Sequence, residues 1–105
     1  MDSQTEIAVA DNPEQERYEI RAGDELAGFT QYKLAPGRIS FIHTEVDDRF
    51  EGQGLGSRLI ASALDDARAR GLVVLPFCPF VRAYIQRHPE YLDLVPEAKR
   101  PQFDL

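Results

Sequence analysis

The stretch Glu-Gly-Gln-Gly-Leu-Gly-Ser at residues 51–57 alternates glycine with other residues and leads directly into an amphipathic helix. Glycine permits backbone conformations with positive φ and lets a ligand come close to the main chain. The first turn of the following helix has N–H groups without intrahelical partners and lies at the positive end of the helix dipole. The stretch therefore predicts a cradle for an anion such as phosphate, with a glycine-rich turn that binds nothing as the alternative.

Two well-known phosphate-binding motifs do not match this stretch. A P-loop needs Gly-Lys-Ser/Thr, and no lysine follows the glycines here. A dinucleotide fingerprint reads Gly-x-Gly-x-x-Gly after a parallel strand. Residues 52–56 read Gly-x-Gly-x-Gly and follow a strand that we expect to be antiparallel. The meaning of the stretch therefore depends on the elements around it.

The flanking sequence alternates strand and helix patterns. In order, it predicts strands at 17–22, 26–34 and 39–46, a helix from residue 55 to the stop at Gly71, a buried strand at 72–75 and a helix at 79–88. Apolar residues on both faces of the third strand favour a central strand covered on both sides. This order is typical of an α+β fold with a strand–helix–strand unit.

The two ends of the chain are more polar than the middle. We expect residues 1–15 to be a flexible N-terminal segment with a short strand at most at Ile7–Ala10, residues 16–95 to be the domain, and residues 96–105 to be a polar C-terminal tail with two prolines.

Composition limits the function classes. The chain has 105 residues, a formal net charge of −6 and one cysteine. A negative chain is poorly suited to nucleic acid or anionic membranes, no apolar run is long enough to span a membrane, and the first residues lack a signal-peptide pattern. A single cysteine cannot form an internal disulfide, so we expect a cytoplasmic protein, and a monomer because no oligomerisation signal is present. If this protein binds an anion, it must do so with a few well-placed groups rather than with a broad basic surface.

Four motifs occur in order along the chain: His43-Thr44-Glu45-Val46, residues 52–57, residues 76–81 and His88-Pro89-Glu90-Tyr91. Together they resemble the GNAT superfamily of CoA-dependent N-acyltransferases, and most closely its small single-domain proteins of the YjdJ type. The superfamily pattern Gln/Arg-x-x-Gly-x-Gly/Ala falls on residues 51–56, with Glu51 where Gln or Arg is usual. The resemblance covers residues 18–95. It implies a GNAT-like fold, acetyl-CoA as cosubstrate, and an amine or protein acceptor.

The resemblance also implies positions for the cosubstrate. The strand with Thr44, Glu45 and Val46 would offer backbone groups to the pantetheine arm, and the strand that ends at Pro76 would splay from it and leave a slot for the thioester. The residues implied in cofactor binding are Thr44, Val46, Gln53, Gly54, Leu55, Gly56, Ser57 and Arg58. Arg49, Arg58 and Arg82 could add charge near the phosphates, with solvated surface charge as the plainer interpretation of each.

Acyl transfer to an amine needs a base for the ammonium proton and a proton donor for the leaving thiolate. Glu45 is the first candidate base, because partial desolvation on an inner strand would raise its pKa, and His43 on the same face is the second. An ion pair with an arginine is the alternative for Glu45, and an ordinary hydrogen-bonded strand residue for His43. The resemblance implies Tyr84 as the proton donor, with a core aromatic as the alternative.

Cys78 directly precedes Pro79 and is expected at the N-cap of the second helix, where the dipole would lower the thiol pKa and favour a nucleophilic thiolate. The alternative is a small buried apolar residue. One cysteine, His43 and His88 lack metal-ligand spacing, so no metal site is expected.

Most superfamily members have a long helical segment between their first two strands, whereas only residues 23–25 lie at the expected place here. An open acceptor site is implied. The leading hypothesis is an N-acetyltransferase; a non-catalytic CoA-binding module and an interaction domain without a ligand are the alternatives.

Overall fold

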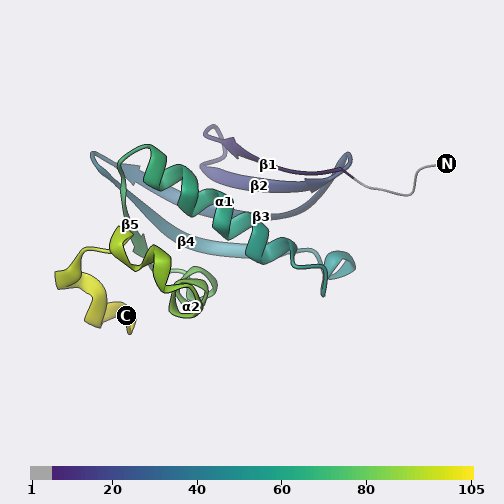
Figure 1. The fold of residues 1–105 in the computed structure, drawn as a ribbon. Helices are drawn as coiled ribbons and strands as arrows, with labels where there is room; N and C mark the ends of the chain where they lie inside the picture. The colour runs from purple at the N-terminus through teal and green to yellow at the C-terminus, as the bar shows by residue number, and fades with distance from the viewer. Residues whose placement is uncertain (1–5) are drawn as a thin grey trace.

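Over residues 6–105, which the structure describes, five strands form one sheet in chain order and two α-helices cover one of its faces (Figure 1). This computed structural model has strands β1 (Ile7–Asn12), β2 (Arg17–Ala22), β3 (Glu25–Ala35), β4 (Arg38–Val46) and β5 (Val73–Pro76), helices α1 (Leu55–Ala69) and α2 (Pro79–Arg87), and 3-10 helices η1 (Asp48–Phe50), η2 (Pro89–Leu94) and η3 (Glu97–Phe103). Strands β1 to β4 are antiparallel and β5 is parallel to β4, which confirms the predicted α+β architecture.

Strand β1 is longer than the sequence suggested. It pairs with β2 from Ile7 opposite Ala22 to Asn12 opposite Arg17. The first two strands of the sheet are therefore joined by residues 13–16, and the assignment of residues 23–25 to this connection was wrong. Residues 13–16 form a tight turn, so no helical segment lies between β1 and β2 within the described residues. Residues 1–5, the start of the predicted flexible segment, lie outside them.

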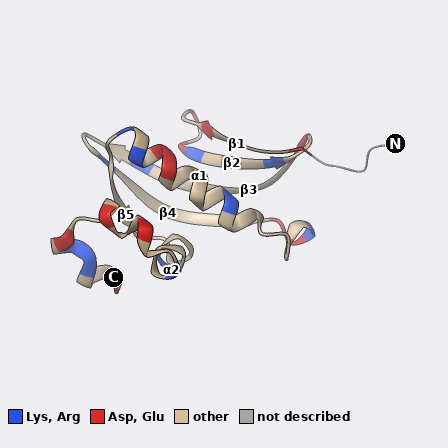
Figure 2. Ribbon diagram, viewed as in Figure 1, with Lys and Arg blue, Asp and Glu red and all other residues tan. Residues whose placement is uncertain are grey.

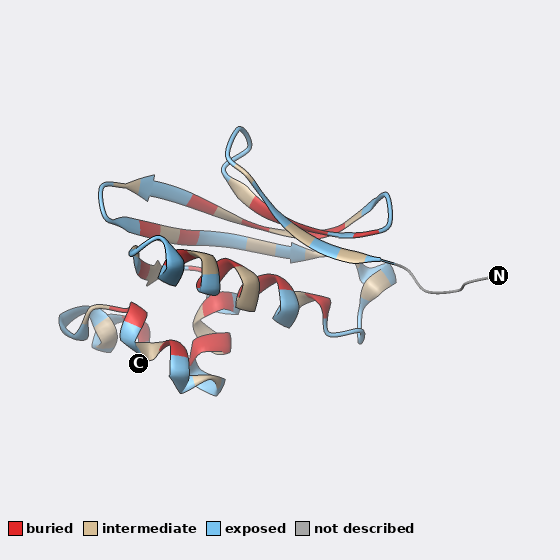
Figure 3. Ribbon diagram, turned by 45° about the horizontal axis from the view of Figure 1, so that its top comes forward, coloured by how far each residue is buried: buried red, intermediate tan, exposed pale blue. Residues whose placement is uncertain are grey.

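One face of the sheet, called the inner face here, packs against α1 and α2 (Figure 3). Alternating strand residues point to it, and the helical stripe of α1 meets them because its apolar residues recur every three or four positions. The fully buried residues of this core include Ile20, Tyr32, Ile39, Phe41, Leu59, Ile60, Leu64, Val74, Val81 and Ile85. The opposite, outer face has no α-helix over it among the described residues, and only the start of η3 reaches it, beside β5.

The sequence predicted that other elements cover both faces of β4, and the structure differs from this prediction. The pairing with β3 skips Ile42, because Phe41 lies opposite Tyr32 while His43 lies opposite Gln31. This β-bulge shifts the alternation by one residue, and Ile42 is left 41% exposed. The strand is central, as predicted, but it is covered on one face only.

Strands β4 and β5 separate after a short ladder. They pair from Arg38 opposite Val73 to Phe41 opposite Pro76, and the last link is the Cys78 N–H, which donates to the Phe41 carbonyl at 2.8 Å. Pro76 has no N–H to continue a ladder. Residues 42–46 of β4 therefore extend beyond β5, which confirms the predicted splayed pair.

The C-terminal residues 96–105 are folded, so the prediction of a polar tail was wrong. Helix η3 buries Phe103, which is 2% exposed and lies edge-on to Phe77 with ring centroids 5.2 Å apart. The Gln86 side chain on α2 donates to the carbonyl of Asp104. This segment lies beside β5, which would otherwise be an open sheet edge (Figure 1).

Charged residues are interspersed along the ribbon, and one cluster ties the sheet to α1 (Figure 2). The hydroxyl of Tyr18 donates to Asp66 of α1, and that of Tyr32 donates to Asp11 at 2.6 Å. Arg70 contacts Asp66 at 3.3 Å. Burial, followed by the nearby carboxylates, raises the pKa of both tyrosines far above the usual range. Both hydroxyls thus stay protonated donors.

No helix within residues 6–105 combines the length and apolar character needed to cross a bilayer.

Candidate functional site

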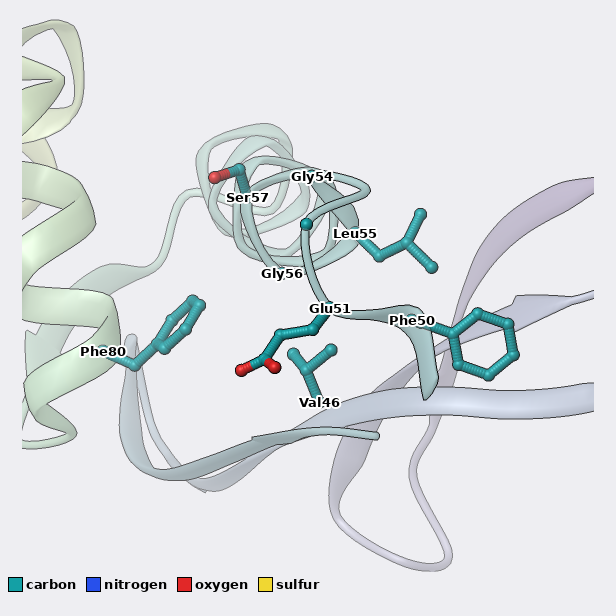
Figure 4. A pocket seen from close by; sticks show the side chains of 9 residues that line it. Val46, Phe50, Glu51, Gly54, Leu55, Gly56, Ser57 and Phe80 are labelled. Carbon is teal, nitrogen blue, oxygen red and sulfur yellow. The ribbon is translucent and has the colours of Figure 1, made fainter. Parts of the chain in front are cut away.

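A pocket of about 370 Å³ opens where β4 ends, α1 begins and α2 begins. It is lined by Val46, Phe50, Glu51, Gly52, Gly54, Leu55, Gly56, Ser57 and Phe80. The structure thus brings the glycine stretch, the end of β4 and the second helix together around one pocket (Figure 4).

The start of α1 is built to leave backbone amides facing this pocket. Gly54 is the N-cap with φ of 73°, a left-handed conformation that disfavours side chains with a Cβ. No side chain of residues 6–105 caps the helix, so the first-turn amides after Gly54 keep their hydrogen-bonding capacity for a ligand. A Cβ on Gly56 would lie 2.7 Å from Phe80, which shows how closely α2 approaches this turn.

Glu51 places a carboxylate in this pocket. Its side chain points toward the space between Val46 and Phe80 (Figure 4). Arg49 does not offset it, because the guanidinium is bound to Asp47 at 3.1 Å and to Glu25 at 3.1 Å. Hydrogen bonds to those carboxylates, first to Asp47 and then to Glu25, raise the pKa of the Arg49 side chain. The local charge near the cradle is therefore less positive than a phosphate site would favour.

The other two arginines are held by backbone carbonyls. Arg82 donates to the Phe77 carbonyl at 3.0 Å, and Arg58 donates to that of Ile7 at 3.4 Å. Arg58 lies in the first turn of α1, one residue beyond the pocket lining.

Cys78 lies at the N-cap of α2, as predicted, and is 3% exposed. Its Sγ lies 3.2 Å from Oγ1 of Thr44, and that hydroxyl lies 2.9 Å from Oγ1 of Thr30. These three groups form a buried polar chain from β3 across the splayed end of β4 to α2. Thr30 was missed in the sequence, because its role depends on strand pairing with Thr44.

His43 and Glu45 lie together on the outer face, with Nε2 of His43 2.7 Å from Oε2 of Glu45. Their side chains are 52% and 61% exposed. The desolvation expected for Glu45 is therefore absent, and its partner is a histidine rather than an arginine. Because Thr44 between them points to the inner face, the pair and Cys78 lie on opposite sides of the sheet.

Tyr84 is not brought to this pocket. Its ring stacks on His88 with centroids 4.1 Å apart, and Tyr91 lies beside it. Burial, then the charges of Glu90 and Asp65, raises the pKa of Tyr84, which makes it a poorer proton donor. The core-aromatic interpretation of Tyr84 fits the structure better. Phe80, one turn earlier in α2, lines the pocket instead. Its signal in the sequence was an aromatic directly after the helix-starting Pro79.

No group of three metal-binding side chains gathers anywhere in residues 6–105.

Comparison with known proteins agrees with this geometry. Residues 17–94 match the family model described as GCN5-related N-acetyl-transferase. A GCN5-like protein from Staphylococcus aureus, solved by NMR, is 23% identical with a TM-score of 0.66 over 90% of each chain. Ard1 from Thermoplasma volcanium is also 23% identical, with a TM-score of 0.50 over 56% of this chain and 41% of that one. No curated protein is similar enough to count as a match. The chain belongs to the family of GCN5-related N-acetyl-transferases.

Proposed function

We propose that this protein binds acetyl-CoA with its pyrophosphate at the start of α1 and transfers the acetyl group to an amine. The observation that carries the proposal is the uncapped first turn of α1, which opens into the pocket beside the splayed end of β4. Backbone amides and the positive end of a helix dipole favour a diphosphate without any basic side chain. This suits a chain whose net charge is −6.

The pantetheine arm is assigned to the free edge of β4. Residues 42–46 extend beyond the ladder with β5, so their backbone groups on that side have no strand partner within residues 6–105. An amide-containing arm can occupy the place of a strand there. The arm would lead from the glycine cradle toward Thr44 and Cys78, where the strands diverge.

The transfer step is assigned to the outer face. The Glu45–His43 pair takes one proton from the ammonium, and the free amine nitrogen then attacks the carbonyl carbon of the thioester. The carbon–sulfur bond breaks, and the departing sulfur takes up the second proton, which the nitrogen loses as the amide forms. Either member of the pair is reached from the outer face, while Cys78 lies on the inner side near the thioester. In this proposal Glu45 is kept as the first candidate base and His43 as the second.

Cys78 is assigned a place next to the thioester rather than a covalent role. Its burial and its contact with Thr44 favour this choice. In the covalent alternative, Sγ attacks the carbonyl carbon, the bond to the CoA sulfur breaks, and the thiol proton moves to that sulfur. The amine would then displace Cys78 in a second step.

A non-catalytic acetyl-CoA-binding module is the second candidate. Two observations favour it: the candidate base pair is solvent-exposed, and Tyr84 lies away from the pocket.

The test compares Gly54→Glu with Gly37→Glu. Both glycines have φ near 75° and an open space where a Cβ would lie, so both variants carry a similar backbone cost. Only Gly54→Glu places bulk and negative charge at the cradle. Calorimetric titration with acetyl-CoA should show at least roughly ten-fold weaker binding for Gly54→Glu and little change for Gly37→Glu.

Equal affinity of the two folded variants would remove the proposed cradle. Acetyl-CoA binding without transfer to any amine would leave the binding module as the function. In an active protein, loss of turnover in Glu45→Gln at unchanged acetyl-CoA affinity supports the assigned base.

A further inference from the structure

A second hollow, of about 510 Å³, lies on the outer face at the start of β4 and β5. It is lined by Arg38, Ser40, Val73, Leu75, Phe77, Pro96 and Lys99. No carboxylate among residues 6–105 lines it, although acidic residues outnumber basic ones by 18 to 12 in the chain. The hollow therefore carries a local positive charge in a chain whose net charge is negative.

The two cations of this hollow are unusual in the protein. Most basic side chains are paired: Arg17 and Arg21 with Glu19, Lys33 with Glu16, Arg49 with Asp47, Arg68 with Asp93, Arg70 with Asp66 and Arg100 with Glu97. Within residues 6–105, Arg38, Lys99 and Arg87 have neither an ion pair nor a side-chain hydrogen bond. Two of these three face the same hollow. A concave site with two unpaired cations is complementary to an anion.

Apart from Ser40, the rest of the lining is apolar, and Ile42 lies between this hollow and His43 along β4. Val73 is 38% exposed and Phe77 is 46% exposed, and Ile42, at 41%, lies next along β4. These are three of the five large hydrophobic residues that are exposed on the described part of the molecule. An exposed apolar strip that ends in charged groups is typical of a surface that binds a partner.

The positions along β4 give the distance between the cations of the hollow and the candidate base pair. Arg38, Ser40 and His43 lie on the outer face of one strand, on either side of the bulge at Ile42. Four strand steps separate Arg38 from His43, or about 13 Å at the usual rise. An extended peptide covers this distance in about four residues. The cations thus lie one short peptide length away from the groups assigned to deprotonate the amine.

We propose that the outer face binds the acceptor as a peptide segment, with its amine at the His43–Glu45 pair and a carboxylate at Arg38 and Lys99. This inference rests on the proposed function and names its substrate class: a lysine amine in a protein segment with an acidic residue three or four positions away. The apolar strip contacts the intervening side chains. Nucleic acid is disfavoured at this face because Glu45 and Asp47 line another hollow at the other end of β4.

The experiment uses binding first, so that it does not depend on turnover. The probes are two blocked peptides, Lys-Ala-Val-Glu-Glu and Lys-Ala-Val-Gln-Gln, together with both peptides in reversed order. Amide chemical-shift titration of the full chain should show that a glutamate peptide perturbs residues 38–43, 73–77 and 99. It should bind two- to five-fold more weakly to Arg38→Gln or Lys99→Gln, a fold-change usual for one exposed ion pair. Arg87→Gln is the matched control, and it should bind like the wild type.

Equal binding of glutamate and glutamine peptides would overturn the inference, and so would equal losses in Arg38→Gln and Arg87→Gln. Acetyl-CoA titration of the same samples separates the two proposals. If acetyl-CoA binds and the acidic peptide does not, the acceptor site is wrong and the proposed cradle stands. If the peptide binds at residues 38–43 and acetyl-CoA does not bind, the proposed function is wrong and the peptide site stands. In an active protein, Arg38→Gln should raise KM for the glutamate peptide and leave kcat unchanged.

Discussion

Oγ1 of Thr44 lies 3.2 Å from Sγ of Cys78, and this contact links the splayed end of β4 to the first residue before α2. The contact fixes the thiol beside the place where the two strands part. It also gives Cys78 a hydrogen-bonding partner within a buried site.

Cys78→Ser tests the role of this thiol. Serine is close in size and can keep the hydrogen bond to Thr44, so we expect a folded protein with kcat/KM within roughly five-fold of the wild type. Mass spectrometry after incubation with acetyl-CoA should find no acetyl group on Cys78. A thioester adduct in the wild type, together with inactive Cys78→Ser, would instead establish the covalent route.

Glu51→Gln should tighten acetyl-CoA binding. The substitution removes a negative charge from the pocket that is assigned to a diphosphate, and relief of one exposed like-charge contact is worth about two- to five-fold in affinity. Calorimetry at low salt checks the change, which should shrink at high salt. Glu97→Gln, at a side chain 92% exposed in η3, is the control. Unchanged affinity in Glu51→Gln would place the diphosphate elsewhere.

Tyr18→Phe should destabilise the fold by about 1–2 kcal/mol, because Asp66 loses a buried donor. Urea unfolding at neutral pH measures the loss. Tyr84→Phe is the control, since no hydrogen bond of its hydroxyl is found within residues 6–105, and it should cost less.

We expect Tyr18, Tyr32 and Tyr91 to make the stability of the fold depend on pH in the alkaline range. Their pKa values are raised in the folded state, with burial as the largest cause, and that of Tyr91 reaches about 12. The folded protein thus holds these protons more tightly than the unfolded chain does. The stabilisation is complete below the ordinary tyrosine pKa of about 10 and is lost as the pH rises above it. Unfolding free energies that stay constant across this range would contradict the prediction.

Phe103→Ala should lower the free energy of unfolding by about 3 kcal/mol, because the ring is buried against Phe77. Thermal unfolding followed by circular dichroism is sufficient to detect it. Gln102→Ala, at an exposed position of the same helix, should have little effect. If both variants have the same unfolding temperature as the wild type, η3 adds nothing to the stability of the domain.

The elements that the sequence predicted well are those set by local signals. The turn at Gly23, the glycine N-cap of α1 and Pro79 at the start of α2 each limit the backbone where they stand. Alternation and helical spacing then determine which side of each element is buried. These signals were enough for the fold family and for the glycine turn that starts α1.

The errors arose where distant residues decide the outcome. The bulge at Ile42 depends on the register with β3, so the exposure of Glu45 could not be derived from β4 alone. The burial of Phe103 depends on a contact with Phe77, and a single aromatic in a polar segment carries no periodic signal. Tyr84 is an exception to this rule, because the ring that stacks on it belongs to His88, four residues later in the sequence.

The four-residue turn at 13–16 has a consequence for selectivity. Within residues 6–105, no helix lies between β1 and β2, so an incoming amine would contact the sheet on one side and no facing element on the other. Such a surface offers a free amino acid few contacts, whereas a longer chain gathers them along its length. Discrimination between acceptors would then reside in the residues that flank the modified amine rather than in the amine itself.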